Sequence, residues 1–238
     1  MSANNQSAQG GDNHINLYEP HVWKHHTKVA GLEWKNPVGT ASGTFQYAAV
    51  RWFYDVSQLG AVCTKGASPV PWEGNPSPRT AESPAANINA VGLQNPGIDH
   101  YLAEDLPKLK AAGAFVISNV AGHCDDDYAA VVEKLADSDA DMLEINVSCP
   151  NVSAGGMSVG TDPVALANLM DRLRPMTDKP MIVKLTPNVT DITVPARAAV
   201  EHGADALSMI NTLKGMRINI RTGKPIIANV TGLSLIHI

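Results

Sequence analysis

The chain has 238 residues, of which 44% are hydrophobic and 17% are charged, and its formal net charge is −5. This length and composition suit a globular domain that buries its own core, and they exclude a fibrous or an intrinsically disordered chain. No apolar run approaches the ~20 residues that a membrane span needs, and no cluster of Lys or Arg indicates a nucleic-acid surface. We therefore expect neither a membrane nor a nucleic acid as a partner.

The N-terminal segment and the cysteines indicate the compartment. Residues 1–20 are rich in Asn, Gln, Gly and Ser, which predicts a disordered tail, and they contain no apolar core of a secretion signal. Cys63, Cys124 and Cys149 are too widely spaced for a disulfide framework or a Cys-x-x-Cys metal site. We expect a cytoplasmic protein that has no bound metal of its own.

After residue 20, short apolar runs alternate with segments of helical periodicity. The runs lack the polar alternation of half-exposed strands, so they predict strands buried on both faces of a parallel sheet. Capping residues and stop glycines delimit the helical segments. The expected strands are 37–41, 61–65, 115–120, 142–147, 181–185 and 206–211, and the expected helices are 98–112, 125–136, 162–174 and 191–202.

Polar residues follow many of these strands, which bears on the kind of sheet. Functional groups at the carboxyl ends of several different strands favour a barrel, because an open sheet gathers them at one switch point. The chain accounts for about six of eight βα units, so we predict an incomplete (β/α)8 TIM barrel. Two long connections, 66–97 and 149–160, are typical of binding loops. The strand-end groups are Ser42, Lys65, Asn119, Asn146, Lys184 and Asn211.

Cys149 has the most reactive side chain near a strand end. It follows a predicted buried strand within the sequence EINVSCPN. It is either a buried structural thiol or a base that abstracts a proton, and the polar neighbours Asn146, Ser148 and Asn151 favour the base. Cys63 and Cys124 lack such neighbours in the sequence, so we interpret them as packing residues.

Lysines and asparagines suggest what such a site would bind. Lys65 and Lys184 each end an apolar strand, so they either emerge into solvent or share an anionic ligand such as a reduced flavin or a substrate carboxylate. A set of asparagines offers neutral donors and acceptors to a flat heterocycle. The small residues of 39–43 would let a flat ring approach the backbone. The asparagines are Asn89, Asn119, Asn146, Asn151 and Asn211.

Seven motifs, in this order, resemble class 1 dihydroorotate dehydrogenases, and most closely the catalytic subunit of type 1B. They are NPVGTASG, CTKGASPVPWEGNPSPR, INAVGLQNPG, ISNVAG, EINVSCPNV, IVKLTPN and MINTLKGMRINIRTGKP, which lie between residues 31 and 232. The resemblance implies a (β/α)8 barrel that carries FMN at its C-terminal mouth. It also implies oxidation of (S)-dihydroorotate to orotate in the biosynthesis of the pyrimidine nucleotide UMP.

The resemblance also implies roles for single residues. Cys149 matches the base that takes a proton from C5 of dihydroorotate while the C6 hydride passes to the flavin. The residues that match FMN contacts are Ala41, Ser42, Gly43, Lys65, Asn119, Asn146, Lys184 and Ile210. The residues that match the substrate pocket are Lys65, Asn89, Gly92, Leu93, Asn146, Asn151, Asn211 and Thr212.

The segment 212–225 favours type 1B over type 1A. In that type electrons leave FMN through the [2Fe–2S] cluster and the FAD of an iron–sulfur flavoprotein partner and reach NAD. The catalytic subunits form the homodimeric core of a heterotetramer. An alternative is a pyrimidine reductase like dihydropyrimidine dehydrogenase, which shares an NxSCP motif but continues with His-Gly where this chain has Asn151 and Val152.

The chain departs from the family at its end. The family continues through two more βα units, whose glycine-rich loops bind the FMN phosphate, whereas residues 233–238 do not match it. We therefore expect a barrel domain over 21–232, followed by a non-family tail, in a truncated copy of a longer protein. A third interpretation follows from this, namely an inactive fragment that binds no flavin.

Overall fold

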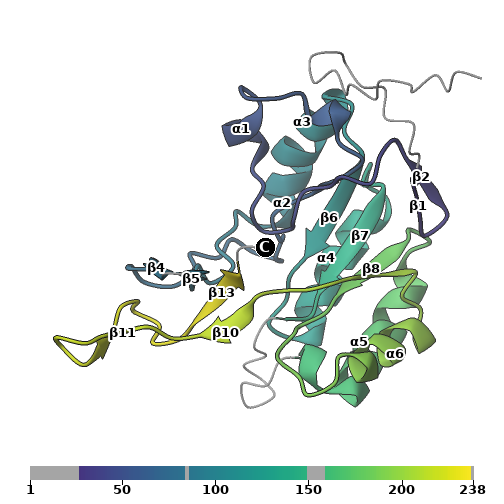
Figure 1. Ribbon diagram of the computed structural model, residues 1–238. Coiled ribbons are helices and arrows are strands. Elements are labelled where there is room, and N and C mark those ends of the chain that lie inside the picture. The colour runs from purple at the N-terminus through teal and green to yellow at the C-terminus, as the bar shows by residue number, and fades with distance from the viewer. Residues whose placement is uncertain (1–26, 84–85, 149–158, 237–238) are drawn as a thin grey trace, which may run out of the picture.

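The computed structural model describes residues 27–83, 86–148 and 159–236, and its main body is a curled parallel sheet (Figure 1). The predicted tail over 1–20 lies outside the described residues. Five strands follow one another across this sheet in chain order, all parallel, and a further parallel bridge joins Gly39 to Ala61 beside the first strand. The strands are β3 (Val62–Cys63), β6 (Val116–Val120), β7 (Met142–Asn146), β8 (Met181–Lys184) and β9 (Ala206–Ser208).

This strand order decides between the two kinds of parallel sheet. An open doubly wound sheet reverses its order at a switch point, whereas a barrel adds each strand beside the previous one. The described strands show no reversal, and the sheet curls toward closure (Figure 1). The chain therefore folds as an incomplete (β/α)8 barrel, as the sequence predicted.

Both faces of the sheet are buried, as expected from its continuous apolar runs. Every residue of β6, β7 and β8 is buried. Leu143 and Ile145 pack in the layer between the sheet and the helices, whereas Met142 faces the barrel interior with Ile117 and Ile182. The two faces thus carry two separate apolar clusters.

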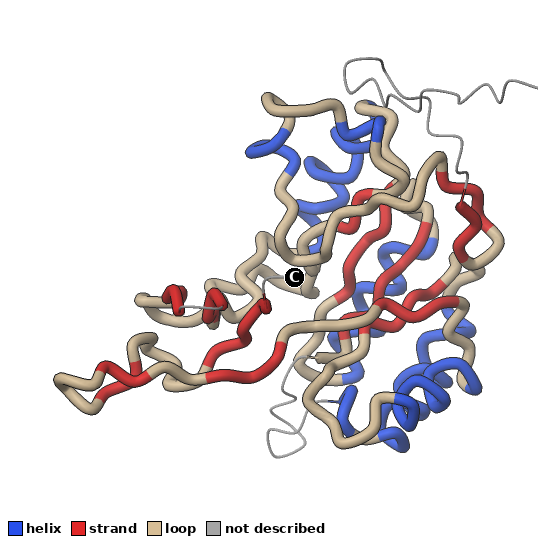
Figure 2. The backbone as a smooth tube through the Cα atoms, in the orientation of Figure 1, coloured by secondary structure: helices blue, strands red, loops and turns tan. Residues whose placement is uncertain are grey.

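Three of the four predicted helices form as expected on the outer layer (Figure 2). They are α4 (Asp125–Ala136), α5 (Pro163–Leu173) and α6 (Thr193–Glu201), and they contribute to the outer cluster. Asp162 caps α5 by accepting hydrogen bonds from the amides of its first turn, and Pro163 occupies the first helical position. Before α6, Asp191 accepts a bond from the Thr193 amide at 2.9 Å, although the N-cap residue itself is Ile192.

The fourth predicted helix, 98–112, is interrupted. It consists of α2 (Ile98–His100), the π-helical turn η2 (Tyr101–Asp105) and α3 (Leu106–Ala111). Pro107 has no amide hydrogen to bond the carbonyl one turn earlier, so the α-helical ladder breaks beside it. The remaining short helices are α1 (Tyr47–Val50), η1 (Val56–Gln58), η3 (Val159–Thr161) and η4 (Arg174–Met176).

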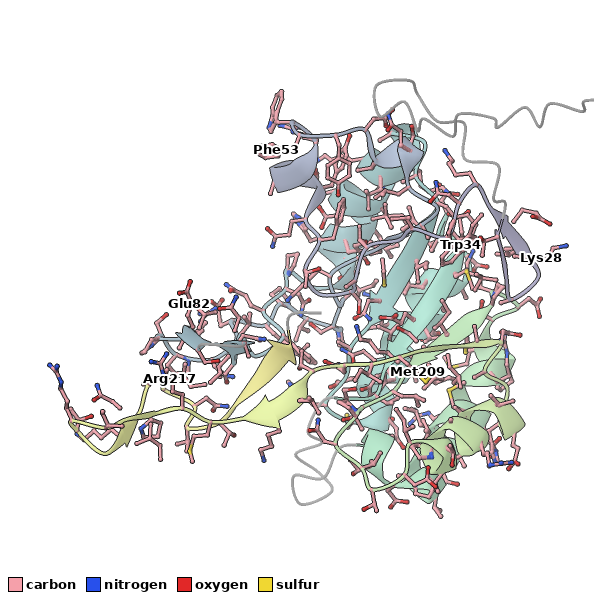
Figure 3. The ribbon with its side chains drawn as sticks, viewed as in Figure 1. Lys28, Trp34, Phe53, Glu82, Met209 and Arg217 are labelled. Carbon is pink, nitrogen blue, oxygen red and sulfur yellow. The ribbon has the colours of Figure 1, made fainter. Side chains whose placement is uncertain are left out.

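An N-terminal hairpin closes one end of the barrel interior. Its strands β1 (Thr27–Val29) and β2 (Leu32–Trp34) pair antiparallel. Trp34, labelled in Figure 3, packs against the interior cluster, and its ring lies 5.8 Å from that of Phe115. The residues that the hairpin covers are Ala61, Cys63, Ile117, Met142 and Ile182.

A second, antiparallel sheet projects from the barrel (Figure 1). Its order is β10 (Leu213–Gly215), β13 (Gly232–Ile236), β5 (Ala86–Asn89) and β4 (Thr80–Ser83). The hairpin of β11 (Ile218–Asn219) and β12 (Lys224–Pro225) extends beyond it. Arg217 ties this extension to β4 by donating to the Glu82 carbonyl (Figure 3). Among the residues whose burial is described, a small apolar cluster of Ile88, Ala90 and Ile227 supports this region.

Several predicted boundaries need correction. The expected strand 37–41 reduces to the bridge at Gly39, because Pro37 has no amide hydrogen and the Thr40 hydroxyl bonds the Cys63 amide in place of a ladder bond. The connection 66–97 is not a plain loop, since it contains the hairpin of β4 and β5. Residues 233–236, expected as a non-family tail, form most of β13.

Candidate functional site

The inward-facing side chains change from apolar to polar along the parallel strands. On β7 the inward positions are Met142, Glu144 and Asn146 in succession. The register places Asn119 beside Glu144, and Asn146 beside Lys184. The carboxyl ends of the strands therefore bring together polar groups from separate βα units, as the sequence predicted.

Lys184 lies at the centre of this polar end. Lys184 is only 8% exposed, and its Nζ donates to Ser42 Oγ at 2.7 Å. This bond joins β8 to the segment after Gly39 across 142 positions of sequence. A lysine ammonium has three donors, and burying it is costly without an anion. The side chain therefore points into the polar end, where its remaining donors can serve a ligand, rather than into solvent.

Lys65 follows β3 on the neighbouring side of the same end. Its Nζ donates to the Gly43 carbonyl at 3.2 Å, and the Gly43 amide donates to the Thr64 carbonyl at 3.3 Å. Burial lowers the pKa of Lys65, because desolvation disfavours the charged ammonium. An anion bound beside Lys65 would raise its pKa again, because it would stabilise the charged ammonium.

Asn146 and Asn211 form the amide part of the site. Asn211 Nδ2 donates to Asn146 Oδ1 at 3.1 Å, and Asn211 Oδ1 accepts from the Thr212 amide at 2.8 Å. Tyr128 fixes the backbone of Asn146, since its hydroxyl donates to the Asn146 carbonyl at 2.8 Å. Both amide groups are therefore held in one orientation, with β7 and the segment after β9 in contact.

Glu144 and Cys63 are two buried residues of the site that were not predicted from the sequence. Glu144, 4% exposed, accepts a bond from Asn119 Nδ2 at 2.7 Å. Cys63, interpreted from the sequence as a packing residue, lies near Glu144 and Ser42, and both act on the pKa of its thiol. An acidic residue inside the apolar strand MLEIN was the signal for Glu144, whereas nothing local to Cys63 indicated these neighbours.

The predicted substrate residues Asn89, Gly92 and Leu93 come from the antiparallel sheet and the loop that follows it. Leu93 adopts a φ of 54° and Gly92 a φ of 76°, and a Cβ at Gly92 would lie 2.6 Å from the Asn75 amide nitrogen. Asn95, which the sequence analysis missed, supports this turn by donating to the Leu93 carbonyl at 2.8 Å. A strained backbone that is held this firmly is common at binding loops.

The remaining predicted residues are placed as follows. Ala41 and Gly43 are exposed around the half-buried Ser42, and Ile210 is 49% exposed. Cys149 and Asn151 lie outside the described residues.

A cavity of about 550 Å³ opens beside Lys65, which is a volume suited to a small organic ligand. Tyr101 lines it, and burial raises the pKa of its hydroxyl to about 12, so the group is a neutral hydrogen-bonding partner at pH 7. Over the residues that the structure describes, no three His, Cys, Asp or Glu side chains gather in a way that could hold a metal ion. Within the same ranges no helix has the length and apolar character to cross a membrane.

The dihydroorotate dehydrogenase family model matches residues 24–236. The chain belongs to this family. The catalytic subunit of dihydroorotate dehydrogenase B (NAD(+)) from Alkaliphilus metalliredigens is 52% identical over 208 residues, which cover 86% of this chain and 68% of the relative. Its counterpart from Alkaliphilus oremlandii is 50% identical with the same coverage. A putative dihydroorotate dehydrogenase A (fumarate) from Aquifex aeolicus is 48% identical over 207 residues, again 86% and 68%.

Family membership confirms the resemblance found in the sequence, and it agrees with the barrel. The polar end of the barrel, rather than the projecting sheet, carries the two lysines and the paired amides. It is the candidate active site of this family member.

Proposed function

We propose that this chain oxidises (S)-dihydroorotate to orotate with FMN as the hydride acceptor, as the catalytic component of a dihydroorotate dehydrogenase in pyrimidine biosynthesis. One observation carries the proposal. In a member of this family, buried Lys184 and half-buried Lys65 converge with the amides of Asn146 and Asn211 at the carboxyl end of one barrel.

The donor set at this end fits a flavin. An isoalloxazine ring is edged with carbonyl and N–H groups, which neutral amides such as those of Asn119 and Asn146 complement. The exposed small residues Ala41 and Gly43 leave backbone accessible to a flat ring. Lys184 and Lys65 place positive charge where the reduced cofactor would carry negative charge. FMN, when bound, supplies the acceptor for the hydride from C6.

The chain's own residues divide the remaining work. Cys149 is the proposed base that removes the proton from C5 of dihydroorotate. Asn146 and Asn211 are proposed to hold the pyrimidine ring, because their mutual hydrogen bond fixes their amides before substrate arrives. Lys65 is proposed to offset the substrate's carboxylate. The further contacts proposed for substrate are Asn89, Gly92, Leu93, Asn151 and Thr212, and those for FMN are Ser42 and Ile210.

The electrons are proposed to leave through a partner subunit. Relatives named as the catalytic subunit of the NAD(+)-type enzyme support a separate electron-transfer subunit. We propose that this partner carries FAD and a [2Fe–2S] cluster and passes the electrons to NAD. The homodimeric core and the cytoplasmic location stay predictions.

The test is a visible absorbance spectrum of the purified chain supplied with FMN, recorded anaerobically before and after dihydroorotate is added. The proposal predicts a bound-flavin spectrum that dihydroorotate bleaches and that dihydrouracil leaves unchanged. Bleaching by dihydrouracil alone would instead favour the dihydropyrimidine dehydrogenase-like reaction. A chain that retains no FMN, or whose bound FMN neither compound reduces, would contradict the proposed activity for these 238 residues.

A further inference from the structure

Inside the barrel, beside Asn119 and two positions before Asn146 on β7, lies a buried acidic group that the proposed mechanism does not use. Glu144 is 4% exposed and projects inward from β7 between Met142 and Asn146. Its neighbours Asn119 and Cys63 are 2% and 4% exposed. A buried carboxylate is costly to folding unless hydrogen bonds and opposite charge compensate it. The groups around Glu144 must therefore compensate its buried carboxylate.

The contacts of Glu144 show how it is compensated. Asn119 Nδ2 donates to its Oε1 at 2.7 Å, and the buried Cys63 thiol lies near enough for the carboxylate to act on its pKa. Burial, and then the negative charge of Glu144, raise the pKa of the Cys63 thiol well above its usual range, whereas the positive charge of Lys184 lowers it. One buried negative and one buried positive charge thus act on the same small volume.

Glu144 also determines how the Asn119 amide lies. Since the nitrogen of that amide is bound to the carboxylate, its oxygen points to the opposite side, toward Gly66. A Cβ built on Gly66 would lie only 2.6 Å from Asn119 Oδ1, so the amide is closely confined on that side by backbone. The Asn119 backbone amide is held as well, by Thr64 Oγ1 at 3.2 Å.

We propose that Glu144 is a positioning residue of the flavin site, which fixes the orientation of the Asn119 amide and supplies the negative charge that balances Lys184. The inference rests on the proposed function, because it concerns the site where FMN is proposed to bind. Two consequences follow. Loss of the carboxylate charge leaves Lys184 unbalanced, which favours the anionic reduced cofactor. Loss of the carboxylate geometry releases the Asn119 amide.

The experiment compares Glu144→Gln and Glu144→Asp with Glu133→Gln, a matched control at an exposed position of α4. The first readout is the midpoint potential of FMN bound to the full chain. We expect Glu144→Gln to favour reduction by roughly tenfold, which corresponds to about +30 mV for a two-electron couple. Glu144→Asp keeps the charge and should restore the wild-type potential, a rescue that a merely structural role would not produce.

The second readout needs no flavin. The side-chain amide resonance of Asn119, assigned by its absence in Asn119→Ala, is compared between the wild-type chain and the two Glu144 variants. We expect both variants to move this resonance, because the carboxylate that binds the amide is neutralised or shortened, and we expect Glu133→Gln to leave it in place.

The two readouts separate the inference from the proposed function. A wild-type chain that binds FMN, with a Glu144→Gln variant of unchanged potential, would overturn the inference and leave the proposed function intact. A wild-type chain that binds no FMN would overturn the proposed function. In that case an Asn119 resonance unmoved by Glu144→Gln overturns the positioning role, and a moved resonance supports it.

Discussion

The two ends of the barrel interior are built from the same strands but have opposite chemistry. At the amino end Met142, Ile117 and Ile182 pack beneath the hairpin of β1 and β2, which seals them from water. At the carboxyl end the same strands present Asn119, Asn146 and Lys184. Only two positions separate Ile117 from Asn119 and Ile182 from Lys184, and four separate Met142 from Asn146.

This difference shows how the fold divides stability from chemistry. The apolar end gains free energy by removing side chains from water, whereas the polar end places a lysine and a carboxylate in a buried setting that opposes folding. A substitution should therefore have different effects at the two ends. At the amino end it should lower stability, and at the carboxyl end it should impair binding or turnover with little loss of stability.

The largest effect is expected at Cys149, the proposed base, which follows Ser148 in the sequence. Replacing Cys149 by Ala should leave FMN binding intact and lower the rate of flavin reduction by dihydroorotate roughly 10²- to 10⁴-fold, the usual contribution of a positioned base. Anaerobic stopped-flow absorbance measures this rate. Cys124→Ala is the matched control and should reduce flavin at the wild-type rate. Near-normal reduction in the Cys149 variant would refute its role as the base.

The next effect is expected at the apolar end. Met142 is fully buried in the interior cluster, so Met142→Ala should lower the free energy of unfolding by about 2–5 kcal/mol through lost contacts and a cavity. Urea unfolding followed by circular dichroism measures the change. Met216→Ala, at a residue that is 50% exposed, is the matched control and should change stability by no more than about 0.5 kcal/mol. Equal losses in the two variants would mean that Met142 does not pack inside the barrel.

The smallest effect is expected at Lys65, where one substitution should raise stability and weaken binding. Burial lowers the pKa of Lys65, so the folded chain binds fewer protons than the unfolded chain between the lowered pKa and the usual one near 10.5. Charged Lys65 therefore opposes folding at pH 7, and the opposition fades as the pH rises through that window. Lys65→Met should slightly raise the melting temperature at pH 7 while it weakens FMN and orotate binding.

Thermal melts at pH 7 and in the alkaline range test this prediction, with the exposed Lys224→Met as the control. The stability advantage of Lys65→Met should shrink as the pH rises, whereas the control should show no such trend. A Lys65 variant that is less stable than the wild-type chain at pH 7 would show that the side chain contributes more by packing than its charge costs.

The sequence was enough to predict five of the six expected parallel strands, three of the four longer helices and the strand-end positions of Lys65, Asn119, Asn146 and Lys184. These follow from local signals, because an apolar run, a cap such as Asp162 and a polar residue where a strand ends are all read within a few positions. The family motifs lie within the same short segments. For that reason the barrel and the polar end could be predicted before any contact was known.

Which of these groups come into contact depends on how the strands pack. The bond from Lys184 to Ser42 spans 142 positions, and the pairing of Glu144 with Asn119 depends on the register between β6 and β7. Glu144 and Ser42 lie near Cys63 for the same reason, since neither is close to it in the sequence. A side chain's chemistry is local, but its partners are set by packing, so the sequence alone could not show that Glu144 lies beside Asn119.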